Sequence, residues 1–445
     1  MLRVRCSRWS AAAVVSLLLS GMSGNSVWAQ LSSSDSDPVS MGWMQGFPPP
    51  EDKRISQPYA DFWSFPKIRW SVCHLRELLP TRNVSRGTGA ARALISRPDA
   101  ALPRLTVVAN DIRSEPIEGP LLDVIATQYT DGLIVLHKGI VKLEYYSGCL
   151  TPERPHATMS MTKSVVGLMA EILIAEGVLE DARKVTDWIP ELESSAFAGA
   201  SLRQVLDMTT GTAFDETYTD PNADIWVYAN ASDAMPKPAD YNGPVGFLDF
   251  LLTLEHKEAE HGQRFKYGTI NTDVLGWVLS RATGASVADL MSDRLWKPMG
   301  AERDAYVKND ALGIVHAGGG LNASMRDLAR LGQLLLDGGK VAGRQIIPAA
   351  AAQSILGGRA SAVATTPDIA AFWPGYRSMW WYGGSEDRPL IAARGVYGQT
   401  IYLDPVAEVV IVRLASDPVP SSRFIDPRVQ PIYRAIADTL LGQDV

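Results

Sequence analysis

Apolar and polar positions along the chain predict strands near both ends and helices between them. The segment GLIVLHKGIVKLEYYSG, residues 132–148, contains two strand-like runs on either side of a His-Lys-Gly turn that begins at His137. This arrangement predicts a β-hairpin. Strand character returns near the C-terminus, and a helix is predicted after it: the strand segments are 379–384, 389–395 and 399–416, and the helix covers 431–442.

The best-defined helix of the pattern begins near Ser160. No proline interrupts the mostly small or aliphatic residues from Ser160 to Ala175, and Gly177 stands where a helix would end. Residues 178–345 are mostly helical or irregular in pattern. Strands at both ends of a helical middle predict an α+β fold, in which N- and C-terminal segments complete one antiparallel sheet flanked by helices, beside a mostly helical subdomain.

Residues 1–29 have the features of an export signal. Arg3, Arg5 and Arg8 form a basic start, the following apolar stretch is too short to span a membrane, and a small-residue cleavage site follows at Ala29. We therefore expect a periplasmic or secreted protein without a stable membrane anchor after signal removal; an uncleaved anchor is the alternative.

The predicted domains follow from composition. Residues 30–104 form an N-terminal arm and extension, whose first part, to about residue 60, is polar and proline-rich and predicts a linker or surface arm without core. The main domain is predicted at 105–445.

Charge and cysteine content exclude some classes of function. Removal of residues 1–29 takes away three arginines and no acids, so the formal charge falls from −7 to −10, which disfavours nucleic-acid binding. Cys73 and Cys149 remain, either as a disulfide or as two separate buried thiols.

No metal-ligand motif occurs, and we expect neither a metal nor another cofactor. The oligomeric state is left open.

The segment TMSMTKSVVG, residues 158–167, places Ser160 and Lys163 three positions apart and therefore on one helix face. Ser160 would lie in the first turn, where free backbone N–H groups and the helix dipole favour an oxyanion. Apolar neighbours would partly desolvate Lys163, and burial disfavours its charged form, which makes it a candidate base.

Spacing alone leaves this motif open to two interpretations. A Ser-x-x-Lys match is expected about once or twice by chance in a chain of this length, so Ser160 and Lys163 are either a nucleophile with its base or a capping serine with a solvated lysine. A second match, Ser64 and Lys67, contains Pro66, which opposes a continuous helix.

Two further segments offer a proton relay and an oxyanion hole. Tyr267 lies just ahead of a helix-like run and is a candidate proton shuttle, with Tyr228 as a competing local match. Gly395 and Gly398 flank a segment predicted as an edge strand beside the serine, and glycine permits close backbone approach there. The N–H groups of Val396 and Ser160 would then hold an oxyanion. A buried tyrosine and an ordinary glycine-rich hairpin are the alternatives.

Taken in order, five motifs resemble the serine β-lactamase-related hydrolases, a family that includes class C β-lactamases and penicillin-binding-protein-like enzymes. The resemblance is strongest to the branch of 6-aminohexanoate-oligomer hydrolases and esterases, and it covers roughly residues 105–440. The motifs are SMTK, VLDMTTGTAFDETY, FKYGTINTDVLGWVL, HAGGGLNASMRDLARLGQLLLDGG and GVYGQTIYLDP.

The resemblance implies an active site between sheet and helical subdomain, with Ser160 as nucleophile, Lys163 as its base and Tyr267 as proton shuttle. It favours Tyr267 over Tyr228 because only Tyr267 has the preceding Phe and the following Leu-Gly helix. Candidate substrate-binding residues are then Glu216, Tyr218, Asn271, His316, Trp381 and Gly395. Tyr218 would bond a leaving amine, and His316 and Trp381 are equally compatible with core packing.

The expected activity is hydrolysis of a small amide or ester through a Ser160 acyl-enzyme. Alternatives are a β-lactamase or D-alanyl-D-alanine peptidase, or a catalytically idle relative that binds cell-wall peptides. Where classical β-lactamases have Lys-Thr-Gly, this chain has Ala393-Arg394-Gly395, and its Tyr-Asn spacing is altered, so the roles of Arg394 and Asn271 are open. A Ser-His-Asp hydrolase is disfavoured because no Gly-x-Ser-x-Gly occurs.

Overall fold

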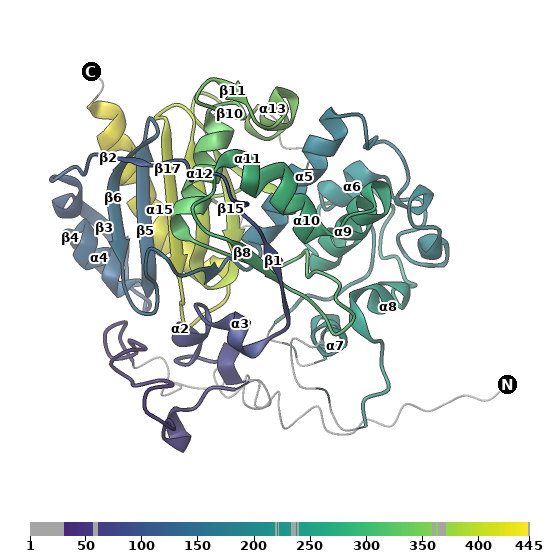
Figure 1. Ribbon diagram of the computed structural model, residues 1–445, viewed down its shortest axis with the longest axis horizontal. Helices are drawn as coiled ribbons and strands as arrows, with labels where there is room; N and C mark the ends of the chain where they lie inside the picture. Colours follow the sequence, from purple (N-terminus) through teal and green to yellow (C-terminus); the bar gives the residue numbers. More distant parts are fainter. Residues whose placement is uncertain are drawn as a thin grey trace.

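A nine-stranded sheet forms the centre of the fold in the computed structural model (Figure 1), which describes residues 31–56, 61–218, 220, 222–232, 237, 240–357, 362–363 and 371–443. Neighbouring strands pair antiparallel, except that β2 runs parallel to β6. In spatial order the strands are β12 (Ala362–Val363), β13 (Gly375–Arg377), β14 (Trp380–Gly384), β15 (Pro389–Gly395), β16 (Gln399–Asp404), β17 (Val409–Ala415), β5 (Thr130–His137), β6 (Ile140–Tyr146) and β2 (Ile95–Ser96).

The sheet joins the two ends of the chain, as the sequence pattern predicts. β17 pairs with β5 from Val409 opposite His137 to Ala415 opposite Thr130. The predicted hairpin is present, and its turn residues Lys138 and Gly139 have φ angles of 51° and 75°, which suit a tight hairpin turn. The predicted α+β class is confirmed. The segment flanked by Gly395 and Gly398 is the turn η9 (Val396–Gly398), which joins the internal strands β15 and β16, so its prediction as an edge strand is wrong.

Helices cover both faces of the sheet. Side chains alternate between faces along a strand: Tyr402 of β16 contacts Tyr433 of α15 (Ser422–Gly442), with ring centroids 5.6 Å apart. Its neighbours Ile401 and Leu403 face α12 (Met325–Leu336), where a Cβ on Gly332 would lie 3.2 to 3.3 Å from them. α12 therefore lies on one face and α15 on the other.

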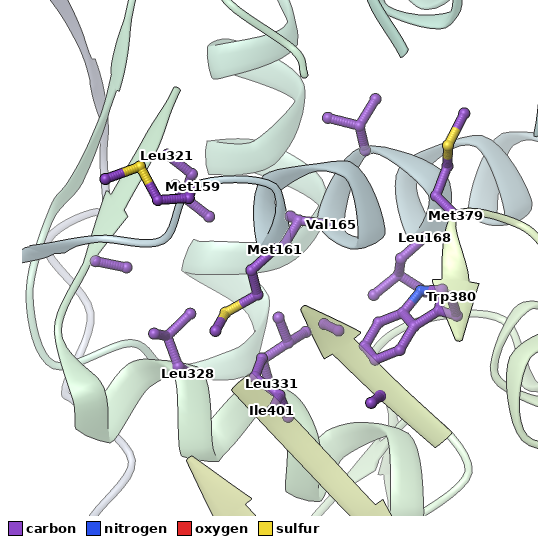
Figure 2. Packing of buried hydrophobic residues seen from close by; sticks show 14 of the residues in the cluster. Met159, Met161, Val165, Leu168, Leu321, Leu328, Leu331, Met379, Trp380 and Ile401 are labelled. Atoms are coloured by element: carbon purple, nitrogen blue, oxygen red, sulfur yellow. The ribbon is translucent and has the colours of Figure 1, made fainter. Parts of the chain in front are cut away.

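The predicted helix at 160 is α5 (Met161–Ala175), and Gly177, with φ 73°, follows its end. All of its side chains from Met161 to Leu173 are buried. Figure 2 shows how this helix packs against side chains of α12 and the sheet; the labelled residues are Met159, Met161, Val165, Leu168, Leu321, Leu328, Leu331, Met379, Trp380 and Ile401. The start of α5 is thus fixed by the core that joins helices to sheet.

Shorter elements complete the helical region and the edges of the molecule. The helices and single turns are η2 (Glu51–Lys53), η4 (Asp61–Trp63), α2 (Ile68–Ser71), α3 (Leu75–Leu78), η5 (Leu102–Arg104), α4 (Leu121–Thr127), η6 (Val185–Asp187), η7 (Pro190–Ser194), α6 (Leu202–Leu206), α7 (Asp224–Ala231), α8 (Gly246–Leu252), α9 (Thr269–Thr283), α10 (Val287–Met291), the π-helix η8 (Ser292–Trp296), α11 (Lys297–Met299), α13 (Ala349–Leu356) and η9 (Val396–Gly398). The small sheets are β1 (Thr81–Val84), β8 (Ala305–Lys308), β9 (Leu321–Ala323) and β7 (His156–Ala157), then β10 (Lys340–Val341) with β11 (Arg344–Gln345), and β3 (Thr106–Asn110) with β4 (Pro116–Pro120).

The segment before residue 105 packs against the rest of the chain. Trp43 and Ile55 are buried, and the buried Arg69 donates hydrogen bonds to Ser33 and Ser36. The expected surface arm without core is therefore wrong for the described part of 30–60, because scattered large apolar residues anchor its polar stretch. The predicted signal at 1–29 lies outside the described residues. No helix within the described ranges is long and apolar enough to cross a membrane.

A disulfide joins this N-terminal segment to the main domain. Cys73 follows α2, Cys149 follows β6, and the Cα atoms of the bridged pair lie 6.0 Å apart. The bridge closes a loop of 76 residues. A link across such a loop restricts the unfolded chain and stabilises the fold.

We expect thiol titration of the denatured, unreduced protein without residues 1–29 to find neither Cys73 nor Cys149 free. Reduction should lower the midpoint of thermal unfolding, because removal of a native bridge typically costs about 2–5 kcal/mol. Two free thiols in the unreduced protein would contradict the bridge.

Lys308 at the end of β8 is a buried cation. It is 8% exposed, and its Nζ lies 5.0 Å from the centroid of the Trp63 ring. Among the described residues no carboxylate pairs with it. Burial, and then the charge of Lys163, lower the pKa of Lys308 to about 8. An unpaired charge at this position opposes folding at neutral pH.

Lys308→Met should therefore stabilise the protein at pH 7, by roughly 1 kcal/mol or more. Between about pH 8 and the usual lysine pKa near 10.4, the unfolded chain binds more protons than the folded one, so the free energy of unfolding of the wild type rises with pH across that window. The variant should lack this rise. Thermal unfolding of both proteins from pH 7 to 10 is the measurement, and Lys340→Met, which replaces an exposed lysine, is the control. If Lys308→Met were less stable than the wild type by the same amount at every pH, the predicted effect of the buried charge would be contradicted.

Candidate active site

Ser160 is the N-cap of α5, and the residues before and after it in the chain are hydrogen-bonded to Leu321. Met159 has φ 50°, a left-handed conformation uncommon outside glycine, and Ser160 follows in helical conformation. The Leu321 carbonyl accepts the N–H of Thr158 at 3.0 Å and its hydroxyl at 2.9 Å, while the Leu321 N–H donates to Thr162 Oγ1 at 3.0 Å. The Ser160 hydroxyl makes no capping hydrogen bond to the helix, which excludes the capping-serine interpretation.

Lys163 lies one turn deeper and is only 1% exposed. Its Nζ donates to Ser160 Oγ at 3.0 Å and to the Gly318 carbonyl oxygen at 2.6 Å. The solvated-lysine interpretation is therefore excluded as well. The local spacing of the motif thus produces direct contact between the two side chains, because positions three apart share a face of α5.

The side chains of the second Ser-x-x-Lys match both bond to Asp61. Ser64 donates to the Asp61 carbonyl oxygen, and Lys67 pairs with the Asp61 carboxylate. The two side chains of this match thus bond to one turn of η4.

Tyr267 approaches the pair from the segment that leads into α9. Its ring centroid lies 5.1 Å from Lys163 Nζ. The ring stacks on Trp381 with centroids 5.7 Å apart and meets Tyr376 edge-on at 6.4 Å. The structure therefore brings Ser160, Lys163, Tyr267 and Trp381 together.

Tyr228, the competing tyrosine, is buried away from the serine turn. Its hydroxyl donates to Asp273 Oδ2 at 2.7 Å, and its ring packs edge-on against Phe214 and Phe250. Burial, and then the nearby Asp273 charge, raise the pKa of Tyr228 well above its usual value. Its phenol is thus committed to Asp273 as a hydrogen-bond donor.

Glu216 holds the start of α9. Its carboxylate accepts the Thr269 N–H at 2.6 Å, the Thr269 hydroxyl at 2.7 Å and the Tyr218 hydroxyl at 2.8 Å. Such a carboxylate suits the positive end of a helix. Tyr218 is 42% exposed and packs edge-on against Trp226. Glu216 therefore positions the helix that follows Tyr267, while Tyr218 keeps an accessible face.

Asn271 also supports α9 from within. It is buried; its Oδ1 accepts the Thr210 hydroxyl at 2.7 Å, and its Nδ2 donates to the Gly268 carbonyl at 3.2 Å. Both ends of its amide are thus bonded inside the protein. These contacts give Asn271 a structural role in the turn after Tyr267, in place of the expected substrate contact.

Gly395 brings the end of β15 against the serine turn. A Cβ at this position would lie 2.5 Å from the Thr158 carbonyl oxygen and 3.0 Å from Met159 Cβ, so only glycine permits this approach. Val396 begins η9 directly after the contact. The backbone of β15 and that of the serine turn therefore lie side by side.

Arg394 is not a free cation at this strand. Its guanidinium pairs with Asp426 of α15 and lies 5.2 Å from the Trp381 ring and 5.5 Å from the Trp373 ring. It is 6% exposed. Arg394 is therefore engaged in the protein interior.

His316 packs behind the glycine run. Its ring stacks on Phe247 with centroids 5.0 Å apart and lies 5.9 Å from the Tyr228 ring. Burial, and then the charges of Lys308 and Lys163, lower the pKa of His316 well below its usual value. His316 is thus a neutral, packed ring rather than a general base.

Asp273 was not among the residues singled out from the sequence. It is a buried acid within α9, and its Oδ1 accepts the Gly318 N–H at 3.2 Å. Burial raises the pKa of Asp273 to about 7, against the opposing effects of the Tyr228 hydrogen bond and the Lys163 charge. The available signal was an acidic residue directly before the apolar run VLGWVL of a predicted helix. Within the described ranges, no three His, Cys, Asp or Glu side chains are grouped as metal ligands would be.

Comparisons with known proteins show similarity to one family over most of the chain. The family model described as Beta-lactamase matches residues 126–433. A curated relative, the 6-aminohexanoate-dimer hydrolase of Paenarthrobacter ureafaciens, is 34% identical over 370 residues, which is 82% of this chain and 90% of that protein.

Solved structures share the architecture. A Bacillus anthracis protein, provisionally named a 6-aminohexanoate-dimer hydrolase, superposes with a TM-score of 0.77 and 29% identity over 85% of this chain and 96% of its own. EstCE1, described as a hydrolase with promiscuous acyltransferase activity, gives a TM-score of 0.54 at 18% identity over 72% of this chain and 98% of its own, which shows the shared fold. The chain therefore belongs to the β-lactamase family of hydrolases.

Proposed function

We propose that this protein is an exported serine hydrolase that cleaves a small amide or ester through an acyl-enzyme on Ser160. The observation that carries the proposal is the 3.0 Å contact between Lys163 Nζ and Ser160 Oγ, with the Tyr267 ring 5.1 Å from the same nitrogen. A nucleophile hydrogen-bonded to a base, with a tyrosine ring beside them, supplies the groups that acyl transfer needs.

In the proposed mechanism, Ser160 Oγ attacks the substrate carbonyl carbon as its proton passes to Lys163. The N–H groups of Ser160 and Val396 hold the negative oxygen of the tetrahedral intermediate. Tyr267 passes a proton to the departing nitrogen or oxygen, and the carbonyl–leaving-group bond breaks. Water then attacks the ester on Ser160 by the same route in reverse and releases the acid.

An amide related to a 6-aminohexanoate oligomer is the favoured substrate class. Support comes from the curated relative, which is named for hydrolysis of the 6-aminohexanoate dimer. The exposed face of Tyr218 offers a hydrogen-bonding surface, and Tyr218 would bond the leaving amine, while the buried Trp381 stacks on the ring of Tyr267.

A β-lactamase or D-alanyl-D-alanine peptidase is the alternative. Arg394 is paired with Asp426, so this strand lacks the free cation that would hold a drug carboxylate, which argues against the alternative. An idle, peptide-binding relative would not need Ser160, Lys163 and Tyr267 together. Profiling against aminohexanoate dimer, nitrophenyl esters, nitrocefin and D-Ala-D-Ala peptides separates these substrates; turnover of nitrocefin or D-Ala-D-Ala peptides alone would reject the favoured class.

Export to the periplasm or medium belongs to the same proposal. It is supported by the basic and apolar start of the sequence and by the disulfide between Cys73 and Cys149, since disulfides persist in oxidising compartments. N-terminal sequencing of exported material should begin at residue 30; an intact residue 1 would reject cleavage.

Ser160→Ala should abolish turnover and labelling by a fluorophosphonate probe, because it removes the attacking oxygen. Ser64→Ala should leave both intact and is the matched control, since Ser64 occupies the other Ser-x-x-Lys match. Labelling that persists in Ser160→Ala would remove the nucleophile assignment.

Tyr267→Phe should slow acylation by an amide by about a hundredfold or more, the usual scale of general acid–base catalysis. Acylation by a nitrophenyl ester should fall less, because nitrophenolate departs without a proton, whereas an alkylamine must be protonated. Lys163→Ala should slow both. Single-turnover acylation is the measurement, because slow deacylation would hide the contrast.

Tyr228→Phe is the matched control for this leaving-group test. It should slow the ester and the amide by similar factors, because its hydroxyl bonds to Asp273 and not to the leaving group. If Tyr228→Phe slowed acylation by the amide more than by the ester, while Tyr267→Phe slowed both equally, Tyr228 rather than Tyr267 would be the proton shuttle.

A further inference from the structure

Asp273, a residue without a role in the proposed mechanism, connects Tyr228 of α7 to Gly318 of the glycine run. It is 4% exposed, on the side of α9 that faces the glycine run 318–320. One carboxylate oxygen accepts the Gly318 N–H at 3.2 Å and the other accepts the Tyr228 hydroxyl at 2.7 Å. A buried carboxylate with two donors is well ordered.

Gly318 carries this contact onward to the catalytic pair. Its N–H is bound by Asp273, while its carbonyl oxygen accepts Lys163 Nζ at 2.6 Å. The residue is also wedged against the start of α9, since a Cβ on it would lie 2.4 Å from Thr269 Cγ2. A displacement of Gly318 would therefore move the oxygen that holds Lys163 beside Ser160.

The charges around Asp273 favour communication with Lys163. The groups that face it are the Tyr228 hydroxyl from α7, Lys163 from α5 and Glu216 from the loop before α7, and neutral His316 packs on the Tyr228 ring. A protonated Lys163 favours the ionised form of Asp273, and the charge of Glu216 opposes it. An ionised Asp273 would in turn stabilise the ammonium that forms when Lys163 takes a proton.

We propose that Asp273 is a positioning residue for Lys163: it fixes Gly318, whose carbonyl aligns the amine, and its carboxylate stabilises the ammonium formed during acylation. This inference rests on the proposed function of Ser160 and Lys163. It assigns to a lysine base the kind of orienting partner that a general base commonly requires.

Asp273→Asn tests the proposal because it keeps the shape and an acceptor oxygen but removes the charge. Acylation should slow by about tenfold or more, while KM changes little because Asp273 does not reach the substrate. The wild-type to variant ratio of acylation rates should be largest above pH 7 and shrink below it, since protonation of the wild-type carboxyl, whose pKa is about 7, produces the same neutral group.

Two further variants keep the test decisive if Asp273→Asn folds poorly. Tyr228→Phe removes a hydrogen bond that favours the ionised carboxylate, so the pH at which the acylation rate falls should move upward. Asp404→Asn is the control: this buried carboxylate at the far end of β16 accepts the Ala407 N–H and pairs with Arg388, so the variant should leave the pH profile unchanged.

A wild-type to Asp273→Asn ratio that is constant with pH, or equal rates in the two proteins, would overturn the positioning role. Such a result with labelling still lost in Ser160→Ala would leave the proposed function intact. Labelling retained in Ser160→Ala would instead reject the function itself.

Discussion

The buried nitrogen of Lys163 is the constraint on which the rest of the site depends. At 1% exposure it has lost its water, and a buried amine without hydrogen-bond partners would be costly. Its two partners, Ser160 Oγ and the Gly318 carbonyl, come from the start of α5 and from a segment 155 residues away. The fold must therefore hold α5, the glycine run 318–320 and α9 at fixed positions, so that protein groups replace the water molecules that would otherwise bind the amine.

Backbone geometry supplies that fixed relation. Gly318 and Gly395 permit approaches that a Cβ would block, the first to α9 and the second to the serine turn. Met159 and Met208 adopt positive φ angles of 50° and 52°, and the Met208 carbonyl accepts the N–H of Lys266, next to Tyr267. Such conformations cost on the order of 1–3 kcal/mol each and persist where surrounding contacts over-determine them.

The electrostatic surroundings of the site are asymmetric. Positive charge on Lys308 or Lys163 disfavours a charged His316, so burial and these two lysines together keep that histidine neutral. Asp273 lies on the α9 side, and the charge of Lys163 favours its ionised form. In the proposed mechanism, the ammonium formed on Lys163 would be stabilised by the carboxylate of Asp273, which is why the position of Asp273 matters for Lys163.

The sequence by itself determined the main elements and the contact between Ser160 and Lys163. Strand alternation and helix periodicity are local properties, so the hairpin, α5 and the C-terminal strands were predictable. Ser160 meets Lys163 because positions three apart share a helix face. Only the tertiary structure decided that Asp273 accepts a hydrogen bond from Gly318 and that Arg394 forms an ion pair with Asp426 of α15. It also decided that the polar segment 31–56 packs against the rest of the protein. Those contacts join residues far apart in the chain, and their existence depends on how helices and sheet pack rather than on any local pattern.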